Sequence, residues 1–371
     1  MPRRGLPLGA ACATLQCMLR KRVVRPQVLS ASPQPQPINL KALAEFLGLA
    51  PATVSLVINR SPAASSIPDA TKARIFAAAK KLNYRANFMA RSLRHQRSFT
   101  IGVVVPEISE GYAALVMSGI EDYLLQEGYF YFVVSHRHRP DLTEEYPQIL
   151  LERAVEGIIA VDTPCEGPLP VPVISVSGHK EIAGVTNILL NHAKAAELAL
   201  KHLWQLGHRQ IAFIKGQAFS SDTEPRWYAI QETAREIGLE IHPKLTGQLE
   251  GDSSSPALGY EVTKSLLATS EPFTALFAFN DVSAIGAIRA IREARRRVPG
   301  DVSVVGFDDI QSAAFQNPAL TTIRQPLRRM GEIAAQTLLQ ILSKSRNGRP
   351  AKPILVEPEL IVRESTATAI S

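Results

Sequence analysis

The spacing of apolar residues divides the chain into two parts with different secondary structure. Between residues 38 and 84, apolar side chains recur every three or four positions in short blocks, which is the period of amphipathic helices. From Phe99 onwards, short apolar runs alternate with longer amphipathic stretches, the rhythm of buried strands followed by helices. The pattern therefore predicts a small all-α domain followed by a larger α/β domain.

Three short helices are predicted in the first part. Asn39 is suited to cap the first helix and Gly48 to end it, whereas Pro51 suits the first turn of a second helix that ends near Asn59. The third helix, over residues 68–82, has an expected inner face of Ala70, Ala73, Ile75, Ala77, Ala78 and Leu82. Helix, tight turn and helix fit a DNA-binding helix-turn-helix and an ordinary helical hairpin equally well.

Short apolar runs with the length of buried strands recur along the second part. They cover residues 101–105, 130–134, 157–161, 173–176, 211–214, 275–279 and 302–307. Amphipathic stretches over residues 113–127, 192–206 and 282–295 supply crossover helices between parallel strands. This alternation predicts two doubly wound parallel-sheet lobes, with a cleft at the carboxyl ends of their strands.

Composition adds information about partners and compartment. The net charge of +7 at pH 7 weakly favours a polyanionic partner. Cys12, Cys17 and Cys165 have neither disulfide-framework nor zinc-ligand spacing, so we expect no structural metal and a reducing, cytoplasmic location. No apolar run approaches the roughly 18 residues of a spanning helix, which argues against a membrane protein.

Residues 1–37 end in a run rich in proline, glutamine and serine, and we expect a disordered extension there. Its basic residues Lys21, Arg22 and Arg25 would either make loose phosphate contacts or belong to a solvated or misassigned N-terminus. A faint signal-sequence pattern over residues 3–19 is discounted because Pro7 and Gln16 interrupt its apolar stretch.

Three segments, Ile38–Ala44, Ala52–Asn59 and Leu82–Tyr84, together resemble the DNA-binding head of the lacI family of bacterial regulators. The resemblance implies that the positions that read bases are Pro51, Ala52 and Leu56. It implies phosphate or positioning contacts from Thr53, Ser55, Asn59 and Tyr84.

The chemistry of these base-reading positions is apolar. None of the three side chains can make a bidentate hydrogen bond, so we expect contacts with thymine methyl groups and readout of DNA shape. The family commonly has a serine at position 50, which caps the second helix and touches phosphate. Ala50 lacks that hydroxyl, at a cost of about 1 kcal/mol of capping.

Residues 87–94 form a short basic segment with helical spacing. They resemble the hinge helix of the lacI family, which folds on the operator. The implied contacts to the minor groove come from Asn87, Ala90, Arg91, Ser92, Leu93 and Arg94. Leu93 matches the leucine that wedges into a central base step, whereas the two arginines would face phosphates or, alternatively, solvent.

Later motifs extend the resemblance over residues 38–366 and are similar to the family's effector-binding domain, which is related to periplasmic sugar-binding proteins. They are residues 206–214, 279–281, 305–309, 320–326 and 362–365. Asp281 and Arg226 match the family positions that bind polar groups of the effector. Candidate wall residues, each equally suited to ordinary packing, are Tyr112, Ser109, Trp227, Asp162 and Phe279.

Two departures from the family pattern leave the effector open. Ser177-Gly178 stands where Asp-Arg is common, and Asn191-His192 where Asp-Asn is common. The polar groups at the cleft have therefore changed. A monosaccharide is the leading candidate, and a nucleoside or a phosphorylated sugar remains open.

The predicted organisation has four parts after the N-terminal extension. They are a helix-turn-helix domain (38–85), a hinge and linker (86–97), a two-lobed effector-binding and dimerisation domain (98–366), and a tail (367–371). The resemblance implies a homodimer that binds double-stranded, pseudo-palindromic operator DNA under the control of a small molecule. Because only residues 366–371 follow Ser365, a dimer is expected rather than a tetramer.

Other classes of protein find less support. The eight histidines do not cluster along the sequence, no Gly-Lys-Ser/Thr phosphate loop occurs, and Asp308-Asp309 after a strand is interpreted as structural. We therefore expect no enzyme, no catalytic residue, no cofactor and no metal. The alternative is a transport-type sugar-binding protein, which should carry an export signal and no helix-turn-helix.

Overall fold

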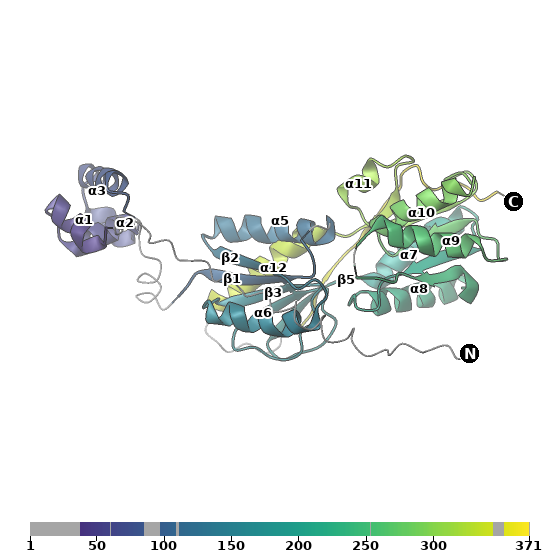
Figure 1. Cartoon of the computed structure of the whole chain (residues 1–371), viewed down its shortest axis with the longest axis horizontal. Helices are drawn as coiled ribbons and strands as arrows, with labels where there is room; N and C mark the ends of the chain where they lie inside the picture. Colours follow the sequence, from purple (N-terminus) through teal and green to yellow (C-terminus); the bar gives the residue numbers. More distant parts are fainter. Residues whose placement is uncertain are drawn as a thin grey trace, which may run out of the picture. The chain divides into compact units, whose positions relative to one another are not determined.

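The computed structural model describes residues 38–59, 61–84, 97–108, 111–252, 254–343 and 352–370. The chain forms two compact units, residues 1–93 and 94–371. In Figure 1 the helices of the first unit are purple, and the second unit runs from blue to yellow. The boundary between the units falls inside the segment expected to be the hinge.

The first unit is a small bundle of helices around one core. Its elements are α1 (Leu40–Leu47), α2 (Pro51–Ile58), the 3-10 helix η1 (Pro62–Ser66) and α3 (Asp69–Lys81). The chain bends by 110° between α1 and α2. Leu43, Val54 and Ile75 are fully buried where the three α-helices meet. The predicted helix, tight turn and helix is therefore present.

The ends of the first two helices follow the residues that the sequence singled out. The side chain of Asn39 accepts a hydrogen bond of 2.9 Å from the backbone N–H of Ala42. Gly48 ends α1 at φ 65°, a left-handed conformation that glycine adopts without steric cost. Ala50 precedes α2 without a side-chain cap, so the expected loss of capping is present.

One expectation about α3 was wrong. Ile75 and Ala78 are buried as predicted, but Ala70, Ala73 and Ala77 are exposed. The short 3-10 helix η1 brings Ala64 into the core, so α3 needs only a narrow apolar stripe to close the bundle. Within the described residues no single helix could cross a bilayer, and only the bent pair α1 and α2 has the required length and hydropathy.

The second unit begins with an N-terminal lobe built on a parallel sheet of six strands in the order β11-β5-β4-β3-β1-β2. The strands are β1 (Thr100–Val105), β2 (Phe130–Ser135), β3 (Gly157–Val161), β4 (Val173–Val176), β5 (Val185–Leu190) and β11 (Ile354–Val356). The helices are α5 (Gly111–Gln126), α6 (Pro140–Glu152) and α12 (Leu327–Ser343). Figure 1 shows α5 and α6 on opposite faces of this sheet.

Two glycines bring α5 and α12 into close contact. A Cβ atom on Gly119 would overlap the carbonyl oxygen of Arg328, and one on Gly331 would overlap that of Val116. The two helices therefore pack at a distance that no larger residue allows at either position. In the same lobe α12 packs on β3, β4 and β5, and α5 packs on β2.

The C-terminal lobe repeats the design with a sheet in the order β12-β10-β9-β8-β6-β7, in which only β10 and β12 are antiparallel among the pairs of described residues. The strands are β6 (Ile211–Lys215), β7 (Thr246–Gln248), β8 (Ala275–Phe277), β9 (Ser303–Asp308), β10 (Thr321–Arg324) and β12 (Glu359–Ile361). The helices are α7 (His192–Gln205), α8 (Thr223–Ile237), η2 (Pro243–Leu245), α9 (Pro256–Leu267), α10 (Asp281–Glu293) and α11 (Gln311–Ala314).

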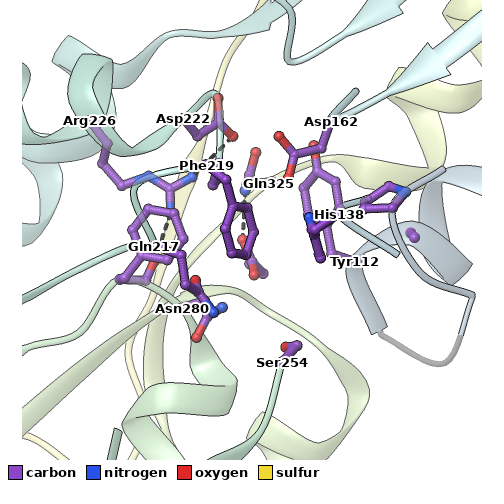
Figure 2. Close-up of a pocket in the computed structure, with 15 residues that line it drawn as sticks. Tyr112, His138, Asp162, Gln217, Phe219, Asp222, Arg226, Ser254, Asn280 and Gln325 are labelled. Atoms are coloured by element: carbon purple, nitrogen blue, oxygen red, sulfur yellow. Dashed lines mark hydrogen bonds and ion pairs between the residues drawn. The ribbon is translucent and has the colours of Figure 1, made fainter. Parts of the chain in front are cut away.

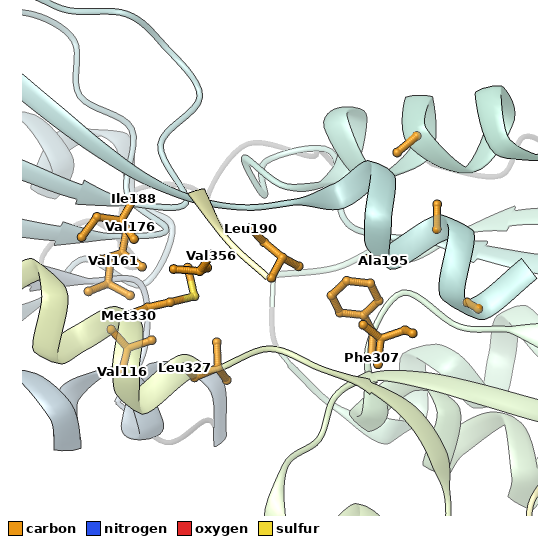
Figure 3. Close-up of a cluster of buried hydrophobic side chains, with 14 of the residues drawn as sticks. Val116, Val161, Val176, Ile188, Leu190, Ala195, Phe307, Leu327, Met330 and Val356 are labelled. Atoms are coloured by element: carbon orange, nitrogen blue, oxygen red, sulfur yellow. The ribbon is translucent and has the colours of Figure 1, made fainter. Parts of the chain in front are cut away.

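In the described part of the chain, the backbone crosses between the lobes three times, after β5, after β10 and after β11. One hydrophobic cluster follows these crossings and contains residues of both lobes, such as Val176 and Met330 in the first and Phe307 in the second. Figure 3 shows Leu190 and Val356 on the segments that join the two sides. The lobes are therefore connected by packed side chains as well as by backbone.

The predicted parallel-sheet lobes are confirmed, and each predicted strand is present. The run over residues 130–134 was wrongly expected to be buried on both faces. It forms β2 at the edge of its sheet, where Phe130 is 58% exposed and Phe132 is 36% exposed. An edge strand has a neighbour on one side only, so its apolar side chains are incompletely covered.

Candidate functional site

The first candidate site is the exposed side of α2. Pro51 and Ala52 are exposed in its first turn, whereas Leu56 is half-buried against the core of the bundle. Two of the three residues expected to read bases are thus accessible in the first turn of the helix. Leu56 would have to reach a base edge with the part of its side chain that remains uncovered.

The residues expected to contact phosphate differ in accessibility. Asn59 is exposed, and its side-chain amide donates hydrogen bonds to the carbonyl oxygen of Ser55 at 2.8 Å and to its hydroxyl at 3.2 Å. Ser55 is buried, whereas Thr53 and Tyr84 are half-buried. Burial raises the pKa of Tyr84. The expected hinge contacts, residues 87–94, lie outside the described residues.

The second candidate site is a pocket between the two lobes, and Figure 2 shows the side chains that converge on it. Its position follows from the topology, because Pro106, Asp162, Gln217 and Asp308 lie at or directly after the carboxyl ends of β1, β3, β6 and β9. The lining is completed by Tyr112, Ala113, His138, Phe219, Ser220, Asp222, Arg226, Ser254, Phe279, Asn280 and Gln325.

Arg226 and Asp222 form the charged pair of the pocket, one turn apart at the start of α8. The guanidinium of Arg226 donates to Asp222 at 3.3 Å and to the carbonyl oxygen of Phe279 at 2.6 Å. Both side chains are buried. Burial alone would raise the pKa of Asp222, but His192, His179 and Arg226 lower it well below its usual range. The carboxylate is therefore ionised.

Two further carboxyl groups face the pocket without a cation of their own. Burial raises the pKa of Asp162 to about 7, and the charge of Asp222 adds to this effect. Burial also raises the pKa of Asp308 to about 7, although Arg226 and a hydrogen bond of 2.6 Å from the amide of Gln325 act in the opposite direction. The pocket therefore offers acceptor oxygens whose charge depends on small changes in their surroundings.

Aromatic side chains supply the apolar part of the lining. The hydroxyl groups of Tyr112 and Ser177 lie 2.7 Å apart within hydrogen-bonding distance, and the ring of Phe279 lies under the guanidinium of Arg226. Phe219 and His138 come from opposite lobes, and their ring centres are 4.0 Å apart. This contact joins the rims of the two lobes at the pocket.

Four of the predicted ligand contacts line the pocket: Tyr112, Asp162, Arg226 and Phe279. Trp227 does not line the pocket. It follows Arg226 on α8, and its ring packs into the core, 5.7 Å from the ring centre of Phe213. Ser109 lies outside the described residues. The pocket thus brings together residues from both lobes that the resemblance had singled out separately.

Asp281 takes a different position from the expected one. It is fully buried at the start of α10, outside the pocket lining. One carboxyl oxygen accepts from the hydroxyl of Thr322 at 2.6 Å, and the other from the backbone N–H of Ile310 at 2.9 Å. Burial raises the pKa of Asp281 well above its usual value. Its contacts tie α10 to the segments that follow β9 and form β10.

The sequence did not single out several residues of the pocket. Asp222, His138 and Phe219 lie in loops after strands, where periodicity carries no signal. Asp308 was interpreted as structural together with Asp309: Asp309 pairs with Arg324 and Arg363, whereas Asp308 accepts from Gln325 and also lines the pocket. A polar residue at a strand's carboxyl end was the available signal for Asp308.

Comparison with known families agrees with this architecture. Residues 39–87 match the family described as bacterial regulatory proteins, lacI family. Residues 200–366 match the periplasmic binding protein-like domain. The two matches fall on the helical unit with the segment after it and on the C-terminal part of the two-lobed unit.

Individual relatives extend the similarity over most of the chain. The HTH-type transcriptional repressor PurR of Aliivibrio fischeri strain MJ11 is 31% identical over 335 residues, which cover 88% of this chain and 97% of the relative. A lac repressor dimer bound to operator and the anti-inducer ONPF has a TM-score of 0.79 at 27% identity, over 90% of this chain and 100% of that one. A transcriptional regulator CelR–cellobiose complex has a TM-score of 0.65 at 27% identity, over 88% and 99%. The chain therefore belongs to the lacI family of bacterial regulatory proteins.

Proposed function

We propose that this protein is a transcriptional repressor that binds a pseudo-palindromic operator as a homodimer and responds to a sugar bound between its lobes. The observation that carries the proposal is a polar pocket at the carboxyl ends of two parallel sheets, in a chain that also carries a helix-turn-helix. The protein acts in the cytoplasm by binding, without catalysis.

On the DNA side, the proposed contacts use the first turn of α2. Pro51 and Ala52 present small apolar surfaces, which suit the methyl groups of thymine in the major groove. Thr53, Asn59 and Tyr84 position the helix on the phosphates, and the buried Ser55 supports Asn59 through their hydrogen bond. Readout by small apolar groups makes the shape of the operator an important part of specificity.

The hinge segment supplies the rest of the proposed operator contacts. Leu93 wedges into a central base step, and Arg91 and Arg94 contact the minor groove or the flanking phosphates, with Asn87, Ala90 and Ser92 beside them. Wedging unstacks bases at a cost of a few kcal/mol, which the contacts to the bent duplex offset. The matching lac repressor structure, a dimer bound to operator, supports two such heads side by side.

In the pocket, the arrangement of charge favours an uncharged ligand with many hydroxyl groups. Asp162 and Asp308 offer acceptor oxygens with no cation of their own, which suit hydroxyl donors and repel phosphate or carboxylate. Arg226 already donates to Asp222 and to the carbonyl of Phe279. A phosphorylated sugar is therefore disfavoured, and a neutral mono- or disaccharide is favoured.

The aromatic side chains support the same ligand class. Phe219 is 41% exposed and stands at the middle of the pocket in Figure 2, where its face can stack on the apolar face of a sugar ring. The CelR complex with cellobiose gives a precedent for a carbohydrate in a matching chain. Asp281 acts indirectly, by fixing α10 and the segment before α11 behind the pocket.

Allosteric control follows from the position of the pocket between two lobes. A ligand that contacts both lobes stabilises one arrangement of them over another, and this difference in free energy is what shifts the protein between DNA-bound and free states. A transport-type binding protein without DNA-binding activity is the alternative, and the helical unit with its helix-turn-helix favours the repressor.

Footprinting of genomic DNA with the purified full chain tests the proposal. We expect protection of a short near-palindrome with a central pyrimidine–purine step. Neutral pentoses, hexoses and disaccharides are then titrated into the complex at fixed salt, with matched sugar phosphates and nucleosides as controls. A neutral sugar should change operator affinity at least tenfold. Tight sugar binding without any protected site would instead favour the transport-type alternative.

A further inference from the structure

Two histidines and an aspartate meet beside the pocket, although they lie far apart in the sequence. His179 follows β4 in the N-terminal lobe, whereas His192 opens α7 and Asp222 precedes α8 in the C-terminal lobe. The Nε2 atoms of His179 and His192 lie 2.8 and 3.2 Å from the same oxygen of Asp222, Oδ1. One ligand atom from each residue lies within 4.8 Å of the other two. Histidines that do not cluster along the sequence therefore do so in the fold.

We propose that His179, His192 and Asp222 bind a transition-metal dication of the zinc type. Two imidazole nitrogens and one carboxylate oxygen are a donor set that zinc accepts, with a fourth position left for water or a ligand. With bonds of about 2.0–2.2 Å, tetrahedral ligand atoms lie about 3.4 Å apart. The two separations from the Asp222 oxygen, 2.8 and 3.2 Å, need to widen only slightly, and the two histidine nitrogens lie within 4.8 Å of each other.

Burial and orientation favour a metal over an ordinary hydrogen-bonded cluster. His192 and Asp222 are buried, and His179 is half-buried. In the described structure Nδ1 of His192 is buried without a hydrogen-bond partner, so one bond to Asp222 is all that offsets the desolvation of this ring. A metal–nitrogen bond at Nε2 would be stronger than this hydrogen bond, and it would leave Nδ1 as it is. Arg226 holds the second oxygen of Asp222, and such outer contacts fix the orientation of metal ligands.

The charges around the cluster point the same way. The charged pocket lining comprises the carboxyl groups of Asp162, Asp222 and Asp308 against one guanidinium, that of Arg226, because burial lowers the pKa of His138 and keeps its ring neutral. If all three carboxyl groups ionise, two negative charges have no partner. A dication at the cluster supplies two positive charges beside these carboxyl groups.

The metal would join the lobes. One of its ligands belongs to the N-terminal lobe and two belong to the C-terminal lobe, so coordination requires the lobe arrangement in which His179 reaches Asp222. The site therefore favours that arrangement and couples metal binding to the separation of the lobes.

Zinc binding to the full chain tests this inference. The cysteines, Cys12, Cys17 and Cys165, are first blocked with N-ethylmaleimide, because a free thiolate is itself a zinc ligand, and the protein is freed of metal with a chelator. Zinc affinity is then measured by competition with a chromophoric chelator for the wild type, H179N and H192N. His202→Asn is the matched control, since His202 also makes a side-chain hydrogen bond, to Thr366 at 3.0 Å, outside the cluster.

We expect one zinc ion per chain, a cobalt derivative whose visible spectrum lacks a thiolate charge-transfer band, and unchanged affinity in H202N. H179N and H192N should each weaken binding by more than the roughly 10- to 100-fold that changes outside the ligand shell cause. Asparagine is common at position 192 in the family, so H192N should fold, and circular dichroism checks both variants. The proposal would be overturned if the blocked wild type failed to bind one zinc ion, or if H179N and H192N both bound zinc as tightly as the wild type.

Discussion

The guanidinium carbon of Arg226 lies 3.6 Å from the centre of the Phe307 ring. Both side chains are buried, and the guanidinium also donates to the carbonyl oxygen of Phe279 and to Asp222. A planar, delocalised cation can stack on a ring and donate in two directions at once, whereas the compact ammonium of lysine cannot. Arg226 therefore fixes α8 against β9 at the back of the pocket.

Arg226→Lys should lower effector affinity at least tenfold and reduce the free energy of unfolding by about 1–3 kcal/mol, because stacking and one directed hydrogen bond are lost. Arg235→Lys on the same helix is the control, since its side chain is 74% exposed. Calorimetric titration and urea unfolding measure the two effects. Equal behaviour of both variants would contradict the role assigned to Arg226.

Substitutions of Asp281 distinguish a structural role of this residue from direct contact with the effector. Burial raises the pKa of Asp281 well above its usual value, so an uncharged amide suits this site, and asparagine can still accept from Ile310 and donate to Thr322. Asp281→Asn should retain stability to within about 1 kcal/mol, whereas Asp281→Ala should lose about 2–3 kcal/mol. Effector affinity of D281N should stay near that of the wild type, and a large loss in this variant would place Asp281 in direct contact with the ligand.

The carboxyl groups of Asp162 and Asp308 predict how stability depends on pH. Their pKa values rise from 3.8 to about 7 on folding, so between these values the folded chain holds protons that the unfolded chain releases. The free energy of unfolding should therefore fall as pH rises from about 4 to about 7, and each carboxyl group contributes a slope of about 1.4 kcal/mol for each step of one in pH.

Asp162→Asn and Asp308→Asn should each flatten this dependence and raise stability at pH 8. Urea unfolding at pH 5 and pH 8 measures the change. Asp301→Asn is a control, because the hydrogen bonds from Arg297 lower the pKa of the half-buried Asp301, so the carboxyl group of Asp301 acts on stability in the opposite sense. If D162N and D308N kept the wild-type slope, other groups would have to account for it.

The missing cap of α2 predicts a stabilising substitution. Ala50 has an extended backbone at the N-cap and no side-chain hydrogen bond, so a serine hydroxyl there can accept from the first turn. Ala50→Ser should raise the stability of the helical unit by about 0.5–1 kcal/mol. Ala77→Ser in the exposed interior of α3 should not stabilise it, because serine is a poorer helix former than alanine. Thermal unfolding of the two variants decides the point.

Operator binding depends, on this proposal, on the first turn of α2. Ala52→Glu places a negative charge on its exposed surface and should weaken operator binding at least a hundredfold without unfolding the unit. Ala77→Glu adds the same charge to α3. Gel-shift titrations at one salt concentration compare the two, and equal losses would mean that net charge, rather than position, is responsible.

The sequence predicted those parts of the fold whose signal is local. The cap at Asn39, the turn at Gly48 and the buried runs that form β1, β3 and β4 follow from adjacent residues. The exposure of Phe130 could not be predicted, because it depends on the place of β2 in the strand order. The exposure of Ala70 on α3 could not be predicted either, because η1 covers the core of the bundle where Ala70 was expected to do so.

The site was predictable only where a family motif marked it. Tyr112 and Arg226 reach the pocket as expected, but His138 and Phe219 face each other only because two separate sheets bring their loops together. The contacts of His179 and His192 with Asp222 could not be predicted for the same reason, because the three residues belong to different segments of the chain. The fold topology decides which residues distant in the sequence come into contact, and the spacing of apolar residues carries no information about it.

The three crossings between the lobes also set the order in which the protein can form during synthesis. The helical unit uses only residues near one another in the chain, so it can fold as soon as it leaves the ribosome. The N-terminal lobe must wait for α12 and β11, which are translated after almost the whole C-terminal lobe. A nascent chain therefore carries a finished helical unit long before it carries the two-lobed unit that could control it.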